Sequence, residues 1–225
     1  METYIIVSEK TWNKKLIEKL SKQLEANWVL IDNKKSFTIE HVNQVAPKLI
    51  FVPHWSYYIP EEIFENYECV VFHETDLPFG RGGSPIQNLI ERGYQETKIS
   101  ALKVTKDIDA GDIYLKRSLS LHGTAEEIFI RINNEVEMMI LEIIKSKRTP
   151  IPQKGEPTFF KRRKPAQSNI DSLISVEQIY DYIRMLDAEG YPNAFIETDK
   201  FRFEFSRASL KSNESIVADV RIIKK

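Results

Sequence analysis

The chain has few of the residues that would indicate disulfides, a metal site or membrane insertion. Cys69 is the only cysteine, which excludes an intrachain disulfide. The four histidines are widely separated and lack the close spacing of metal ligands. No apolar run approaches the length of a membrane span, and the first four residues lack the layout of a signal peptide. These features predict a cytoplasmic protein with no metal and no membrane partner.

The chain also lacks an excess of charge of either sign. Its 32 basic and 33 acidic residues leave a formal net charge of −1. Proteins that bind a long nucleic acid usually carry a basic excess, so a nucleic-acid partner is disfavoured. Hydrophobic residues make up 42% of the 225 residues, which is enough for the core of one sizeable domain with a small appendage.

Short apolar runs alternate with helical patterns in the first part of the chain. The helix expected at 8–24 has Trp12, Leu16 and Leu20 on one face. The other helices are expected at 38–45, 60–64, 84–93 and 124–146, and the strands at 4–7, 28–31, 49–52, 69–72, 97–105 and 113–115. The first four strands are continuously apolar, as in strands that are buried on both faces. The pattern predicts an α/β fold with a Rossmann-like, mostly parallel sheet.

Local signals mark the ends of two of these helices. Ser84 and Pro85 form a typical helix start, and Gly93 a typical stop. Thr124 and Glu127 have the spacing of a capping box.

The composition changes near residue 145. Between 145 and 164 there are eight basic residues, one acidic residue and three prolines, which indicates a linker. A helix at 176–187 and strands at 194–197, 201–205 and 215–223 are expected to follow. We therefore predict a catalytic domain over 1–150, and a basic linker followed by a small C-terminal α+β unit over 151–225. Phe201, Phe203 and Phe205 share a strand face that the tail helix or a second subunit must cover, so a homodimer through this unit is expected.

Polar residues follow several of the predicted strands. In sheets of this kind, ligands bind beyond the carboxyl ends of the strands, which places residues 8–10, 54–56 and 73–75 along one rim. His73 ends the fourth strand, and Asp109 begins a later turn. A histidine and a carboxylate that meet can transfer a proton at neutral pH.

Three segments together resemble the formyltransferases that use 10-formyltetrahydrofolate. They are 73–78 (His-x-Thr-x-Leu-Pro), 81–85 (Arg-Gly-x-x-Pro) and 109–112 (Asp-x-Gly-Asp). The resemblance implies the formyltransferase fold, a folate donor, His73 as catalytic base and Asp109 as the residue that orients it. A turn alone would also explain the last segment, since aspartate and glycine favour turns.

The resemblance and the predicted rim imply two sets of binding residues. The folate-binding set is Pro53, Trp55, Ser56, Tyr57, Leu77, Arg81, Gly82, Asp107, Ala110, Gly111 and Asp112. The acceptor-binding set is Ser8, Lys10, Gly83, Ser84, Lys161, Arg163 and Lys164. Two alternatives stay open, because the aromatic residues could belong to the core and the basic run 161–164 could be a solvated face. The glycines at 80–83 lack the lysine-serine ending of a phosphate loop.

One position departs from the family pattern. The family has an asparagine two residues before the histidine, where this chain has Val71. Valine cannot donate a hydrogen bond, and loss of one oxyanion donor typically costs about 100- to 1,000-fold in turnover. His54, at the end of the neighbouring strand, is the first candidate for a replacement donor, and Thr75 is the second.

The residues Thr75 and Asp76 suggest the acceptor. At this point the chain resembles bacterial nucleotide-sugar N-formyltransferases linked to pseudaminic acid and flagellin glycosylation. That likeness implies a UDP-linked 4-amino-4,6-dideoxy sugar of the N-acetyl-altrosamine type, so the expected partners are a nucleotide sugar and a folate. A formyltetrahydrofolate hydrolase and a non-catalytic folate or nucleotide binder remain as alternatives, and Val71 favours the binder.

Overall fold

The computed structural model describes residues 1–10 and 13–225, and the chain forms two compact units within them. The first unit comprises 1–81, 98–119 and 132–159, and the second comprises 82–97, 120–131 and 160–225. The position predicted for Trp12 lies outside the described residues. The division expected between 150 and 151 stays a prediction.

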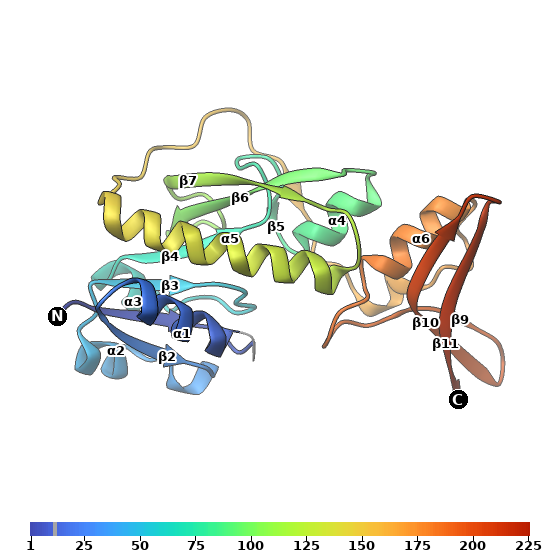
Figure 1. Cartoon of the computed structure of the whole chain (residues 1–225), viewed down its shortest axis with the longest axis horizontal. Helices are drawn as coiled ribbons and strands as arrows, with labels where there is room; N and C mark the ends of the chain where they lie inside the picture. Colours follow the sequence, from blue (N-terminus) through green and yellow to red (C-terminus); the bar gives the residue numbers. More distant parts are fainter. Residues whose placement is uncertain (11–12) are drawn as a thin grey trace. The chain divides into compact units, whose positions relative to one another are not determined.

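The first unit contains a six-stranded sheet (Figure 1). Its order is β2 (Asn27–Ile31), β1 (Thr3–Val7), β3 (Leu49–Val52), β4 (Cys69–His73), β6 (Glu96–Lys103) and β7 (Ile113–Ser120). The first four strands in this order run parallel, and β6 is antiparallel to β4. The α/β fold with a mostly parallel sheet is therefore confirmed.

Helices cover both faces of this sheet. They are α1 (Asn13–Gln23), α2 (Ile39–Val45), α3 (Glu61–Asn66) and most of α5 (Ala125–Ser146), with a 3-10 turn at Lys34–Ser36. Val42 of α2 and Ile63 of α3 belong to one buried cluster with Ile5 of β1. Helices α1 and α5 lie side by side, joined by an ion pair of 3.0 Å between Lys19 and Glu137. Burial from two sides explains why β1 and β3 are continuously apolar.

The expected helix ends were only partly right. The backbone N–H of Thr124 donates to Glu127 and the N–H of Glu127 donates back to the Thr124 hydroxyl, so the capping box of α5 is confirmed. Ser84 precedes α4 (Pro85–Glu91) as expected, but it adopts a left-handed φ of 52° and makes no capping hydrogen bond. Its hydroxyl instead accepts from the N–H of Arg163 at 3.1 Å.

The second unit holds α4, α6 (Val176–Arg184) and a three-stranded antiparallel sheet. The sheet order is β11 (Ser215–Lys224), β10 (Phe201–Lys211) and β9 (Ala194–Glu197). A further 3-10 turn spans Pro165–Ser168. The expected C-terminal helix and hairpin are thus confirmed.

The predicted linker is more ordered than its composition suggested. Ile151 exchanges both backbone hydrogen bonds with Ile113, the first residue of β7. Farther along, β8 (Phe159–Phe160) pairs with β5 (Arg81–Gly82). Basic composition predicted solvent exposure but did not reveal these backbone contacts.

Candidate active site

The end of β4 and the turn before β7 bring His73 and Asp109 together in the first unit. Nδ1 of His73 lies 3.5 Å from Oδ2 of Asp109, longer than a direct hydrogen bond but within the range of an ion pair. Only 7% of His73 is exposed. Asp109 has a left-handed φ of 52°, which aspartate tolerates better than most residues. The turn thus aims a carboxylate at the imidazole.

A close backbone approach explains the glycine in this turn. A Cβ atom on Gly111 would lie 1.8 Å from the carbonyl oxygen of Lys103 in β6. No side chain fits there unless the backbone moves, so glycine lets the turn pack against the sheet.

The second nitrogen of His73 is held by the backbone. Nε2 lies 2.8 Å from the carbonyl oxygen of Gly80, which can only accept, so the neutral ring carries its proton on Nε2. Nδ1, 3.5 Å from Asp109, is then the unprotonated nitrogen of the neutral ring. Asp109 was expected to orient His73, and the contact with Gly80 is what sets the tautomer of the ring.

Thr75 also turns towards Gly80. Its hydroxyl donates to the same carbonyl oxygen at 3.4 Å, and its own carbonyl accepts from the hydroxyl of Ser100 at 2.7 Å. Thr75 has no exposed surface. It was expected as a replacement oxyanion donor, but its hydroxyl supports the loop that carries Gly80.

His54 and Glu74 form a second titratable pair in the first unit. Nδ1 of His54 lies 3.7 Å from Oε1 of Glu74. Burial, with a smaller effect of Lys10, lowers the pKa of His54 to about 4. Burial raises the pKa of Glu74 to about 7, although His73 acts in the opposite direction. The sequence analysis did not select Glu74, because the motif allows any residue at this position. The one signal in the sequence was an acidic residue next to the motif histidine.

Val71 is partly buried. It packs against the apolar cluster of Leu77, Leu102 and Ile113 and pairs with Leu102 across the sheet. Leu77, which was expected to contact folate, is only 1% exposed in the same cluster, so its role is in the core.

Arg81 is held by a residue that the sequence did not single out. Its Nη2 and Nε atoms donate to Oε1 of Gln153 at 2.8 and 3.3 Å. The amide nitrogen of Gln153 donates to the carbonyl oxygens of Asp109 and Gly111 at 2.8 and 2.9 Å. Gln153 therefore connects two of the three motif segments. No local pattern marked it, because its partners lie more than 40 residues away.

The aromatic residues expected to contact folate follow β3. The ring of Trp55 contacts Tyr57 and Phe37, with centroids 5.2 and 5.9 Å away. Its indole N–H is buried and has no hydrogen-bond partner among the described residues. Pro53 is buried, whereas Ser56 and Tyr57 are exposed. Trp55 thus packs against the core. Its indole N–H would donate to a ring nitrogen or a carbonyl oxygen of a bound ligand.

The other residues that were expected to bind folate lie in the turn at 107–112 or in β5. Asp107 is exposed, and its carbonyl accepts from the N–H of Ala110 at 3.4 Å and from the Thr105 hydroxyl at 3.2 Å. The carbonyl of Asp112 accepts from the N–H of Lys103 at 2.8 Å. A Cβ atom on Gly82 would lie 2.4 Å from a backbone oxygen of β8, so this glycine permits a close approach of two strands.

The expected acceptor residues divide between the units. Ser8 is buried at the end of β1, and its hydroxyl accepts from the N–H of Lys10 at 3.3 Å. Gly83, Ser84 and the basic run 161–164 belong to the second unit. Lys161 and Lys164 are exposed, and Gly83 leaves no room for a Cβ atom beside Arg162.

Arg163 was expected to contact a diphosphate, but it is a structural residue of the second unit. Its Nη1 lies 2.6 Å from Oε2 of Glu91, and its Nη2 donates to the carbonyl of Gln167 at 2.7 Å. The guanidinium also lies over the ring of Tyr182, 5.0 Å from the centroid. Only 8% of the Arg163 side chain is exposed, so these contacts occupy the group.

Comparisons with known proteins identify the family. Residues 7–144 match the family model described as "Formyl transferase", and residues 165–223 match "Methionyl-tRNA formyltransferase, C-terminal domain". The first match covers more than half of the chain. The fold and these matches define the class of protein as formyltransferase-like. The chain belongs to the formyl transferase family, as the sequence predicted.

Individual relatives agree with this assignment. A structure named methionyl-tRNA formyltransferase from Clostridium thermocellum is 55% identical, with a TM-score of 0.97 and coverage of 100% of both chains. A sugar N-formyltransferase from Shewanella sp. FDAARGOS_354 shares the fold, with 14% identity, a TM-score of 0.65 and coverage of 97% of this chain and 96% of that one. Methionyl-tRNA formyltransferase from Francisella philomiragia is 26% identical over 196 residues, which are 83% of this chain and 62% of the relative.

The chain spans between half and two thirds of the length of the curated relatives that it matches, from 50% to 62%. In the described part of the chain, no helix is long and apolar enough to cross a membrane.

Proposed function

We propose that this chain transfers a formyl group from 10-formyltetrahydrofolate to the amine of a nucleotide-linked amino sugar. The 3.5 Å separation of Nδ1 of His73 and Oδ2 of Asp109 carries the proposal, because these atoms lie in two motif segments far apart in sequence. Membership of the formyl transferase family supports the donor and the reaction type.

The arrangement suits the proton transfers of this reaction. The amine nitrogen bonds to the formyl carbon, and the bond from that carbon to N10 of the folate breaks. The pair formed by Nδ1 of His73 and the Asp109 carboxylate takes up the proton that the amine loses, and passes a proton to the leaving N10. Once Nδ1 is protonated, both ring N–H groups face acceptors, namely Asp109 and the carbonyl of Gly80. His73 is then the base, and Asp109 and Gly80 stabilise its charged form.

The oxyanion that forms on the formyl group needs a donor. Val71 provides none, and the hydroxyl of Thr75 is directed to Gly80. His54 is neutral at neutral pH because burial lowers its pKa to about 4, and a neutral imidazole keeps one N–H. We therefore assign this role to His54.

The residues after β3 and the turn before β7 suit the donor folate. Trp55 and Tyr57 offer aromatic surface and a buried indole N–H for the flat pterin ring. The backbone of the turn at 107–112 lies beside the catalytic aspartate and would flank the same ring.

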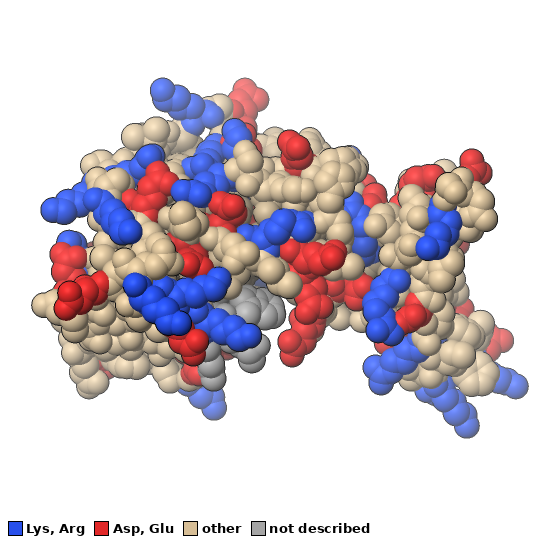
Figure 2. All heavy atoms as spheres, viewed as in Figure 1, with Lys and Arg blue, Asp and Glu red and all other residues tan. Residues whose placement is uncertain are grey.

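The distribution of charge on this protein favours a small acceptor over a long RNA. The net charge is −1, and Figure 2 shows basic and acidic side chains intermixed over the visible face. A long RNA is bound chiefly through clustered basic residues. The likeness at Thr75 and Asp76 supports a UDP-linked 4-amino-4,6-dideoxy sugar of the N-acetyl-altrosamine type, as used for pseudaminic acid and flagellin glycosylation. Lys161 and Lys164 remain the candidates for the diphosphate.

Methionyl-tRNA is the second candidate acceptor. The name of the 55% identical structure and the match at 165–223 favour it. For both acceptors the nucleophile is a primary amine, so the same chemistry at His73 applies and only the recognition differs.

Mass spectrometry separates these possibilities. The purified protein is incubated with 10-formyltetrahydrofolate and, separately, with UDP-amino sugars, dTDP-amino sugars and methionyl-tRNA. A gain of one formyl group on a sugar supports the proposal, and formylation of methionyl-tRNA alone refutes the sugar acceptor. Donor turnover without any amine identifies a hydrolase. Folate binding in calorimetry without turnover identifies a non-catalytic binder.

A further inference from the structure

Both the nitrogen and the oxygen of the Gln153 side-chain amide form two hydrogen bonds, although the residue lies in a basic, proline-rich segment. Its amide nitrogen donates to the carbonyl oxygens of Asp109 and Gly111, and its amide oxygen accepts twice from Arg81. Carbonyl oxygens only accept and a guanidinium only donates, so the contacts determine the orientation of the amide. Neither a carboxylate nor an apolar side chain could make both sets of bonds.

The bond to Asp109 acts where the backbone is strained. Asp109 has a left-handed φ of 52°, a conformation that residues with a side chain adopt at a cost. Gln153 holds the carbonyl of this same residue. On the other side, Gly111 packs so closely against Lys103 that a Cβ atom would lie 1.8 Å from its oxygen. The turn is thus held between β6 and Gln153.

The segment around Gln153 is anchored on both sides. Ile151 exchanges two backbone hydrogen bonds with Ile113, at 2.8 and 3.0 Å. The hydroxyl of Thr158 accepts from the N–H of Gly80 at 2.7 Å, and Gly80 is the residue whose carbonyl holds His73. One short segment therefore supports both members of the histidine–aspartate pair.

We infer that Gln153 is a positioning residue that holds Asp109 in place beside His73 for formyl transfer. The inference deepens the proposed function and rests on it. Gln153 acts through its two N–H bonds to the turn, while Arg81 serves to orient the amide.

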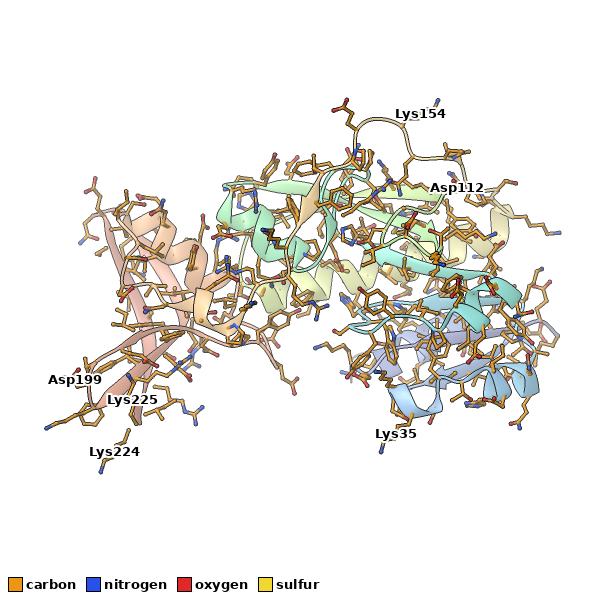
Figure 3. The ribbon with its side chains drawn as sticks, turned by 180° about the vertical axis from the view of Figure 1, so that it is seen from behind. Lys35, Asp112, Lys154, Asp199, Lys224 and Lys225 are labelled. Atoms are coloured by element: carbon orange, nitrogen blue, oxygen red, sulfur yellow. The ribbon has the colours of Figure 1, made fainter. Side chains whose placement is uncertain are left out.

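Two variants and a matched control test this role. Gln153→Ala removes all four hydrogen bonds, whereas Gln153→Glu keeps an acceptor for Arg81 and loses the donors to the turn. Lys154→Ala is the control, because this exposed neighbour points away from the ribbon in Figure 3. A displacement of about 1 Å can cost on the order of 100-fold in rate. We expect kcat to fall about 10- to 100-fold in both Gln153 variants, with Lys154→Ala like wild type.

Several outcomes would overturn the inference. If Gln153→Glu retains the wild-type kcat, the role belongs to Arg81 and not to the turn. If both variants lose melting temperature while the folded protein keeps its kcat, Gln153 is only structural. A wild-type protein that turns over no donor refutes the proposed function instead. In that case, a crystal structure of Gln153→Glu and the ¹⁵N resonances of the His73 ring decide: an unchanged turn and unchanged resonances contradict the positioning role.

Discussion

Nδ1 of His54 lies 3.7 Å from Oε1 of Glu74, and both side chains are nearly closed off from solvent. Burial moves their pKa values in opposite directions, to about 4 for His54 and to about 7 for Glu74. Near pH 6, therefore, the imidazole is deprotonated and the carboxyl group is mostly protonated. Two ionisable groups beside the His73 motif are thus both uncharged near this pH.

This pair predicts an unusual dependence of stability on pH. The folded protein binds the Glu74 proton more tightly than the unfolded chain does, so the free energy of unfolding falls as pH rises from about 4.5 to about 7. His54 has the opposite effect between about 4 and 6.5, because its folded pKa is lowered. Glu74→Gln should remove this fall and keep the rise due to His54.

Urea unfolding at several pH values measures this difference. The stability of Glu74→Gln relative to wild type should increase between pH 4.5 and 7 by up to about 3 kcal/mol. The exposed acid Glu156, changed to glutamine, is the control and should show no such trend. Parallel curves for Glu74→Gln and wild type would contradict the raised pKa.

The roles proposed for His73 and Asp109 predict a large loss of rate without a loss of fold. Asp109→Asn keeps a side chain that tolerates the left-handed φ but removes the negative charge beside His73. His73→Gln removes the base, and general base catalysis typically contributes about 100- to 10,000-fold. We expect losses in this range for His73→Gln and a smaller loss for Asp109→Asn. Donor turnover gives the rates and melting temperature monitors the fold; a His73→Gln rate within twofold of wild type argues against the mechanism.

His54→Ala tests the replacement of the missing oxyanion donor. If the N–H of His54 stabilises the oxyanion, its removal should lower kcat by about 100- to 1,000-fold. Thr75→Val is the comparison and should reduce kcat less, since the hydroxyl of Thr75 is directed to Gly80. An unimpaired formyl-transfer rate in His54→Ala would remove His54 from the mechanism.

The close packing of the turn at 107–112 predicts that replacing Gly111 destabilises the protein more than replacing Gly93. Gly111→Ala forces the backbone apart, because its Cβ would lie 1.8 Å from the Lys103 oxygen, and we expect it to cost more than about 2 kcal/mol. Gly93→Ala is the matched control: it has a φ of 78° but no atom within 4 Å of its Cβ, so about 1 kcal/mol is expected. Denaturant unfolding compares the two, and equal losses would show that the contact is easily relieved.

The exposed apolar residues on β11, the outer strand of the C-terminal sheet, lead us to predict a homodimer. Register places Val220 and Ile222 of β11 on the same face as Phe203 and Phe205 of β10, and 49% of Val220 and 62% of Ile222 are exposed. Light scattering at micromolar concentration should give the mass of a dimer, and Ile222→Lys that of a monomer. Val217→Lys, on the opposite face of β11, should leave the dimer intact. A monomeric wild type would refute the prediction.

The fold was largely predictable because its signals are local. Continuous apolar runs such as Tyr4–Val7 indicated strands that are buried on both faces, and each of these residues is at most 1% exposed. Caps were less predictable. Thr124 caps its helix as expected, whereas Ser84 has the same type of side chain in a left-handed conformation and bonds to a distant segment instead. A cap depends on backbone angles that the residue type alone does not determine.

The amino-acid order by itself determined the family motifs, the pairing of His73 with Asp109 as a hypothesis, and the succession of strands and helices, because these follow from residue type and short-range periodicity. Only the tertiary structure decided that Gly80 holds the tautomer of His73, that burial raises the pKa of Glu74 to about 7, and that Gln153 supports the turn. Such properties arise from atoms that meet across space, and desolvation and hydrogen-bond geometry leave no trace in the spacing of residues along the chain.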